Sequence, residues 1–274
     1  MIPILPLLVL FHSTYGADSV LWRNNDFPVD DPLKNFHPQE HGFFNYGSLT
    51  ASKDPAGGHQ NVLRVFYKKG TYSQIRGLKG AQFYSQPSST HTAMTLSYQV
   101  YFSHGFDFVK GGKLPGLYGG AIATCSGGRH STSCFSARLM WREHGDGEIY
   151  TYIPDQPSSF CDRSDIACSP AKGTSLGRGK WRFPTGKWIK ITEHVHLNTV
   201  GKNDGFAKIW IDGKLVMNTK DIVWRVKDNI KINGIFFSTF FGGATKEWGA
   251  KKDCYSYFKD FVLSMGASVP PLLG

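Results

Sequence analysis

A glycine-rich segment carries a lysine in surroundings that are unusual for a surface cation. Lys113 lies within residues 110–120, after a glycine pair and before the sequence Leu114-Pro115-Gly116. Glycines let a backbone approach a ligand closely, and the expected Leu-Pro-Gly turn holds the lysine in place. A lysine positioned in this way can stabilise a developing oxyanion. A basic surface turn is the plainer interpretation, and the GxxxxGK[ST] spacing of a phosphate-binding loop is absent.

A second group of reactive side chains follows from alternation along two segments. In residues 135–142 and 148–153, side chains two positions apart point to the same face of a strand. If the two segments pair through residues 144–147, one shared surface carries Ser136, Arg138, Tyr150 and Tyr152. An arginine binds a carboxylate through two parallel hydrogen bonds, and a tyrosine beside cations can transfer a proton. An amphipathic sheet face without function is the plainer interpretation.

The acidic residues near this surface do not favour a glycoside hydrolase. Such an enzyme needs two carboxylates about 5–9.5 Å apart. Glu143, Asp146 and Glu148 form the only tight acidic cluster nearby, and they straddle a glycine-rich turn instead of sharing one strand face. No compact set of His, Asp and Glu indicates a metal site. A non-catalytic carbohydrate-binding module remains an alternative, because aromatic and basic residues also bind uronates.

Short strands separated by turn residues must position these groups. The pattern predicts strands at residues 61–67, 94–102, 135–142, 148–153, 188–197, 206–211, 215–218, 230–239 and 257–263. Asp212-Gly213 predicts a tight hairpin between two of them. No helical pattern of twelve or more residues lies between the strands. The sequence therefore predicts an all-β protein with a single-domain β-sandwich, a jelly roll, over residues 17–274.

The first sixteen residues and the cysteines indicate secretion. Residues 1–16 contain an apolar run of about ten and read as a signal peptide, too short to span a bilayer. In an oxidising compartment, two short local disulfides are the simplest pairing, Cys125 with Cys134 and Cys161 with Cys168. Cys254 is then left unpaired. We expect an extracellular, monomeric protein.

The net charge of +10 points to an acidic partner, which is nucleic acid, anionic lipid or an acidic polysaccharide. The expected signal peptide disfavours nucleic acid, and no later stretch is apolar enough for a membrane. A basic run between residues 172 and 190 is either a groove rim or a solvated loop, and the solvated loop is favoured. These considerations leave an acidic polysaccharide as the expected partner.

The motifs together resemble a known family. The run 110–117, the Ser136-x-Arg138 strand and Tyr150-x-Tyr152 are similar to the alginate lyases of polysaccharide lyase family 14, especially those of plant-eating gastropod molluscs. The resemblance extends through Trp210-Ile211-Asp212-Gly213 and residues 237–243. It implies a jelly roll with a polymer groove on its concave sheet and no metal or organic cofactor. The Lys-Gly-Gly-Lys-Leu-Pro-Gly run also occurs in related glucuronan lyases, so glucuronan is an alternative substrate.

The resemblance also implies roles for individual residues. Lys113 matches the essential lysine, in preference to Lys110, and Tyr150 and Tyr152 match the tyrosine pair. The substrate-contacting residues correspond to Ser136 and Arg138, and more loosely to a groove histidine at His130. The implied function is a secreted alginate lyase that cleaves (1→4)-linked β-D-mannuronate by β-elimination.

The chemistry of β-elimination explains why these residue types are needed. The proton on C5 of a uronate is very weakly acidic beside an ionised carboxylate, so a cation must stabilise the enolate-like intermediate. We expect Lys113 to be that cation and Arg138 to bind the carboxylate. Nearby cations favour a tyrosine phenolate, so the tyrosine pair would jointly supply base and acid. In mannuronate H5 and O4 lie on the same side of the ring. A base and an acid placed on that one side can therefore carry out the elimination.

Overall fold

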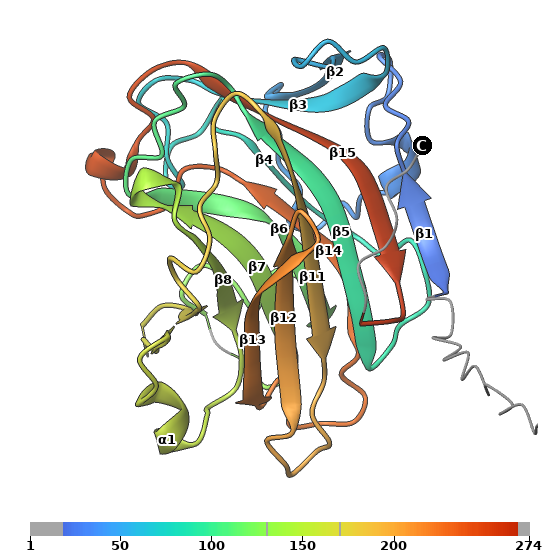
Figure 1. The fold of residues 1–274 in the computed structure, drawn as a ribbon, viewed down its shortest axis with the longest axis vertical. Helices are drawn as coiled ribbons and strands as arrows, with labels where there is room; N and C mark the ends of the chain where they lie inside the picture. The colour runs from blue at the N-terminus through green and yellow to red at the C-terminus, as the bar shows by residue number, and fades with distance from the viewer. Residues whose placement is uncertain (1–18, 130, 170, 268–274) are drawn as a thin grey trace, which may run out of the picture.

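Two antiparallel sheets stacked face to face make up the molecule (Figure 1). The computed structural model describes residues 19–129, 131–169 and 171–267. The first sheet has the order β13 (Lys214–Ile222), β12 (Gly205–Ile211), β11 (Trp188–His196), β5 (Ala93–Phe102), β15 (Cys254–Ser264), β3 (Asn61–Tyr67) and β2 (Leu49–Lys53), with β1 (Val20–Asn24) paired to β15. The second has the order β4 (Ala81–Ser85), β14 (Ile232–Thr239), β6 (Gly111–Gly120), β7 (Cys134–Arg142), β8 (Gly147–Tyr152), β10 (Thr174–Leu176) and β9 (Ile166–Ala167).

The apolar core lies between the two sheets, as alternation predicts. On β7, Phe135, Ala137, Leu139 and Trp141 are at most 1% exposed and belong to this core. Their neighbours on the same strand point to the opposite side of the sheet, because successive strand residues alternate between faces. Strand β7 pairs with β8 in the expected register, with Arg138 opposite Tyr150. The prediction of one shared polar surface on these two strands is confirmed.

All nine strands predicted from the pattern are present, with ends that differ by a few residues. The structure adds β1, β2, β4, β9 and β10, which are five residues or shorter, and it adds β6. The prediction of a turn after Lys113 is wrong, because residues 111–120 form a strand ten residues long. Glycine and proline are poor strand formers. Strand β6 forms because β14 and β7 pair with its two edges.

A bulge in β6 accommodates its proline and reverses its alternation. The register with β7 shifts between Lys113, which lies opposite Met140, and Gly116, which lies opposite Arg138. Two residues, Leu114 and Pro115, therefore fill the space of one. Bulges are where a strand tolerates proline, and they re-aim the side chains beside them.

Several local predictions are confirmed. Disulfides join Cys125 to Cys134 and Cys161 to Cys168, and Cys254 is a buried free thiol. Asp212 and Gly213 both have positive φ angles, as a tight hairpin turn requires. Helix is limited to the four residues of α1 (Ser158–Cys161) and to short 3-10 turns in the part of the chain described. No helix among these residues has the length and apolar character needed to cross a bilayer.

Candidate active site

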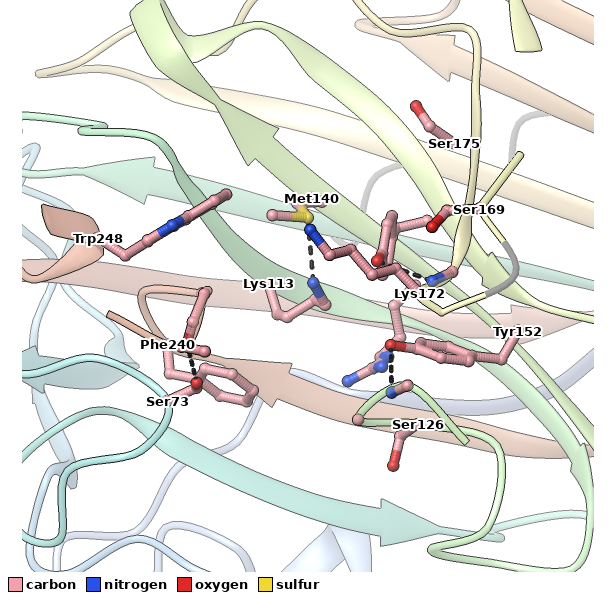
Figure 2. A pocket seen from close by; sticks show the side chains of 18 of the residues that line it. Ser73, Lys113, Ser126, Met140, Tyr152, Ser169, Lys172, Ser175, Phe240 and Trp248 are labelled. Carbon is pink, nitrogen blue, oxygen red and sulfur yellow. Dashed lines mark hydrogen bonds between the residues drawn. The ribbon is translucent and has the colours of Figure 1, made fainter. Parts of the chain in front are cut away.

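A pocket of about 760 Å³ opens on the outer face of the second sheet, the face turned away from the core. Its floor comes from β6, β7 and β8. Its walls come from the loops around residues 126–128, 167–169 and 171–173, the loop before β4 and the segment after β14. Figure 2 shows Lys113 near the middle, with Trp248 and Phe240 on one side and Lys172 and Tyr152 on the other. The walls thus bring together residues from most of the length of the chain.

The pocket is strongly cationic. Its described lining contains no Asp or Glu, and its basic side chains are Lys79, Lys113, Arg138, Arg142, Lys172 and Arg178. Cations gathered without lining carboxylates attract a polyanion. No group of three or more His, Cys, Asp or Glu side chains among the described residues could hold a metal ion. The lining therefore fits an anionic ligand, and it offers neither the carboxylate pair of a hydrolase nor the ligands of a metal.

One buried carboxylate lies just beneath the floor. Glu148 is fully buried and pairs with Arg142 at 2.6 Å and with Arg178 at 2.6 Å, while Ser175 donates a hydrogen bond to it. These contacts occupy both carboxylate oxygens. Glu148 thus orients the two arginines toward the pocket and is not free to act as an acid or base.

Lys113 is almost completely buried in the pocket floor. Its side chain is 8% exposed, and its Nζ lies 3.1 Å from the sulfur of Met140 and 4.0 Å from the centre of the Tyr150 ring. Burial, reinforced by Arg138 and Arg142, lowers the pKa of Lys113 well below its usual value. The folded chain therefore favours the uncharged form of this amine more than water does.

Two loops hold the hydroxyls of the tyrosine pair. The Tyr150 hydroxyl accepts a hydrogen bond from the backbone N–H of Gly173 at 2.8 Å, and the Tyr152 hydroxyl accepts one from Gly128 at 2.9 Å. Their rings meet edge to face, 5.7 Å apart. Burial, followed by the neighbouring Tyr152, raises the pKa of Tyr150 to about 12. The raised pKa favours the protonated form of Tyr150, the form that can act as an acid.

Arg138 is a buried cation with unused hydrogen-bonding capacity. It is 2% exposed, and its guanidinium lies 4.3 Å from the centre of the Phe236 ring and donates to the Ser238 hydroxyl. Among the described residues, its Nε has no hydrogen-bond partner. Burial lowers the pKa of Arg138, and the Tyr152, Tyr84 and Tyr150 phenols counteract that effect. An arginine nevertheless stays protonated in proteins. Arg138 is thus a standing positive charge at the pocket floor.

The structure brings together four of the six residues that the sequence indicated. Lys113, Arg138, Tyr150 and Tyr152 line the pocket. Ser136 lies on the same face of β7, but it is 1% exposed and its hydroxyl donates to the carbonyl of Cys125, so it is absent from the lining. His130 falls outside the described residues. Lys110 is exposed in the turn before β6, away from the pocket lining.

The basic run after residue 172 divides into two parts. Lys172 and Arg178 are exposed and line the pocket, which agrees with the alternative of a groove rim. Lys180 and Arg182 pair instead with acidic residues outside the lining, Asp165 and Asp146.

Sequence reasoning missed several lining residues. Trp248 packs against the cluster around Tyr150, and Phe240 and Lys79 also line the pocket. The Lys79 ammonium donates to the Ser73 carbonyl at 2.7 Å and lies 4.8 Å from the centre of the Phe44 ring. None of these residues belongs to a local pattern that distinguishes it from other surface residues. The packing of distant segments brings them to the pocket.

Comparison with known proteins agrees with this arrangement. The chain is 43% identical to the marine PL-14 alginate lyase from Aplysia kurodai, over 90% of this chain and 100% of that one, with a TM-score of 0.84. An alginate lyase from a Chlorella virus is 25% identical over 81% of this chain and 90% of its own, with a TM-score of 0.70. Exolysin of Paramecium bursaria Chlorella virus 1 is 24% identical to this chain over 215 residues. The matched region makes up 68% of this chain and 31% of Exolysin.

The strands β6, β7 and β8 of the pocket floor all fall within residues 55–261, which match the family model described as polysaccharide lyase 14. That match covers well over half of the sequence and includes every lining residue taken from these strands. The chain belongs to the polysaccharide lyase 14 family.

Proposed function

We propose that this protein is a lyase that cleaves an anionic polyuronate by β-elimination. The observation that carries the proposal is the composition of one pocket. A buried lysine and two buried tyrosines lie among permanent cations, with no carboxylate in the described lining. A glycoside hydrolase would need two carboxylates there. A binding module would have no need for a lysine and a tyrosine whose pKa values are displaced in opposite directions.

The first chemical task is to make the C5 proton removable. The uronate carboxylate lies next to C5, and the guanidinium of Arg138, which lines the pocket, can receive it. The positive charge then stabilises the enolate-like intermediate in a site that is largely shielded from water. In its neutral form, Lys113 has a free lone pair and can take the proton from C5. This revises the role expected from sequence, because Arg138 supplies the charge and Lys113 the base.

The second task is to protonate the departing O4. Tyr150 keeps its proton up to high pH, since burial raises its pKa to about 12. Its hydroxyl is held in place by the hydrogen bond from Gly173 and by one with Tyr152. Tyr152 lies beside it, with Arg138 5.8 Å from the centre of its ring, and would share in binding the leaving group. Elimination then leaves a 4,5-unsaturated sugar at the new non-reducing end.

The arrangement favours mannuronate as the reacting sugar. Lys113 and Tyr150 lie in contact on neighbouring parts of one pocket floor. Base and acid therefore reach the sugar ring from one side, which suits the syn H5 and O4 of mannuronate and not the anti pair of guluronate. The alginate lyases among the relatives support alginate as the natural polymer. Glucuronan remains a second candidate substrate.

We further propose that the protein acts outside the cell as a monomer. Two disulfides in one small domain are typical of an oxidising compartment. Residues 1–16, proposed as a signal peptide, lie outside the described residues. The domain that remains in the mature protein would be residues 17–274.

Incubation of the purified protein with polymannuronate, polyguluronate and glucuronan in separate reactions tests the proposal. We expect ultraviolet absorbance from the conjugated product to rise fastest with polymannuronate. New reducing ends without that absorbance would indicate a hydrolase. Binding of the polymers without cleavage would indicate a non-catalytic module, and faster cleavage of polyguluronate would contradict the proposed geometry.

A further inference from the structure

Lys113 faces the pocket only because β6 contains the bulge. Lys113 and Leu117 are four residues apart, so a regular strand would turn both to the same face. In the structure Lys113 lines the pocket, whereas Leu117 is fully buried in the core between the sheets. The extra residue at Leu114–Pro115 reverses the alternation between them. Whatever holds the bulge therefore decides where the lysine points.

Two side chains from the opposite sheet bond to the backbone of this bulged segment. The hydroxyl of Tyr98 on β5 donates to the carbonyl of Pro115 at 3.0 Å. The carboxyl group of Glu193 on β11 accepts a hydrogen bond from the backbone N–H of Leu117, also at 3.0 Å. Both side chains are 0% exposed, and they come from adjacent strands. They cross the apolar core to reach the bulge.

A carboxyl group in an apolar core is otherwise unfavourable. Desolvation raises the pKa of Glu193 well above its usual value, and its other oxygen has no hydrogen-bond partner among the described residues. A leucine at this position would pack without that cost. The function that the glutamate does perform is to accept a hydrogen bond from the buried backbone N–H of Leu117, next to the bulge.

We infer that Tyr98 and Glu193 are positioning residues, which fix the bulge of β6 and thereby aim Lys113 at the substrate. The inference rests on the proposed role of Lys113 as the base. Neither residue touches the pocket lining, so each acts only through the backbone of β6. A displacement of about 1 Å in a reacting group can lower a rate on the order of 10²-fold. Loss of either hydrogen bond should therefore lower the catalytic rate and not only the stability of the fold.

Four variants separate positioning from simple stabilisation. Tyr98→Phe keeps the ring and removes the donor to Pro115. Glu193→Leu removes the acceptor, and Glu193→Gln keeps an uncharged acceptor of the same shape. The matched control is Thr192→Val. Thr192 is also buried and donates from β11 to Ser97 of β5, but its side chain points to the opposite face of the sheet from Glu193.

The measurements are kcat/KM on polymannuronate as a function of pH, and NMR titration of the Lys113 amine. Tyr98→Phe and Glu193→Leu should lower kcat/KM by about 10- to 100-fold. They should also move the Lys113 pKa upward, toward the value of a solvated lysine, because a loosened side chain regains water. The ascending limb of the kcat/KM profile should shift to higher pH together with the Lys113 pKa. Glu193→Gln and Thr192→Val should retain the wild-type rate, pH profile and lysine titration.

The outcomes distinguish this inference from the proposed function. Folded Tyr98→Phe protein with the wild-type rate and lysine titration would refute the positioning role. So would a Thr192→Val variant with the same defects as Glu193→Leu. If Glu193→Leu does not fold, Tyr98→Phe decides the question, since it loses one hydroxyl only. If the wild-type protein forms no unsaturated product, the proposed function fails, and the NMR titration still tests whether the two residues fix Lys113.

Discussion

Replacing Tyr150 by phenylalanine isolates the acid step of the proposed reaction. The change removes one hydroxyl and keeps the ring that lies 4.0 Å from the Lys113 amine and 5.5 Å from the Arg142 guanidinium. The hydrogen bond from Gly173 is lost, and one neutral hydrogen bond contributes about 1 kcal/mol to stability. The cations that bind the polymer are unchanged. Folding and binding should therefore survive the substitution.

The effect on the rate should be far larger than the effect on stability. Proton transfer by a positioned side chain contributes roughly 10²- to 10⁴-fold, which corresponds to about 3–5 kcal/mol of the barrier. Absorbance of the unsaturated product should give kcat, thermal unfolding the stability, and calorimetry with mannuronate oligosaccharides the binding. We expect kcat to fall at least 10²-fold while the dissociation constant stays within a few fold.

Tyr118→Phe is the matched control for Tyr150→Phe. Tyr118 lies on β6 and is 1% exposed, but its hydroxyl has no hydrogen-bond partner among the described residues and does not line the pocket. Its loss should leave kcat unchanged. A Tyr150→Phe protein with more than a third of the wild-type kcat would refute Tyr150 as the acid. Equal losses in both variants would show a general effect of removing a buried hydroxyl.

Three further predictions concern other parts of the molecule. Lys113→Ala should lower kcat/KM by on the order of 10²-fold or more while Lys110→Ala retains it, and the reverse result in the same absorbance assay would show that the wrong lysine was chosen. Serine at both Cys125 and Cys134 should lower the free energy of unfolding in urea by about 2–3 kcal/mol, since the closed loop spans nine residues, and unchanged unfolding would contradict this. Burial lowers the pKa of His194 from 6.5 to about 4, so the fold should lose on the order of 3 kcal/mol as the pH falls from about 6.5 to 4, because the unfolded chain then binds the extra proton. His194→Asn should remove most of that loss, and an equally steep loss in this variant would assign the effect elsewhere.

The sequence by itself determined the features that depend on neighbours along the chain. Alternation in residues 135–142 assigned Trp141 to the core and Arg138 to the polar face, because a strand turns successive side chains to opposite sides whatever it packs against. The same rule placed Tyr150 and Tyr152 together. The two disulfides were predictable for a similar reason, since each joins cysteines fewer than ten residues apart.

Only the tertiary structure decided the features that depend on contacts between distant segments. Residues 111–120 are poor in strand-forming residues, and β7 and β14 on either side make them a strand. Trp248 reaches the pocket from a segment about a hundred residues beyond the tyrosine pair. Ser136 satisfies the pattern for a pocket residue, yet its bond to the carbonyl of Cys125 withdraws it from the lining.

The protonation states of the site are likewise a tertiary property. The sequence suggested a charged lysine beside a tyrosine phenolate, because opposite charges favour each other. The folded chain buries both groups. Desolvation, reinforced by Arg138 and Arg142, lowers the pKa of Lys113, and desolvation raises the pKa of Tyr150. How deeply a side chain is buried depends on what packs over it, and that packing comes from strands and loops which the local sequence does not specify.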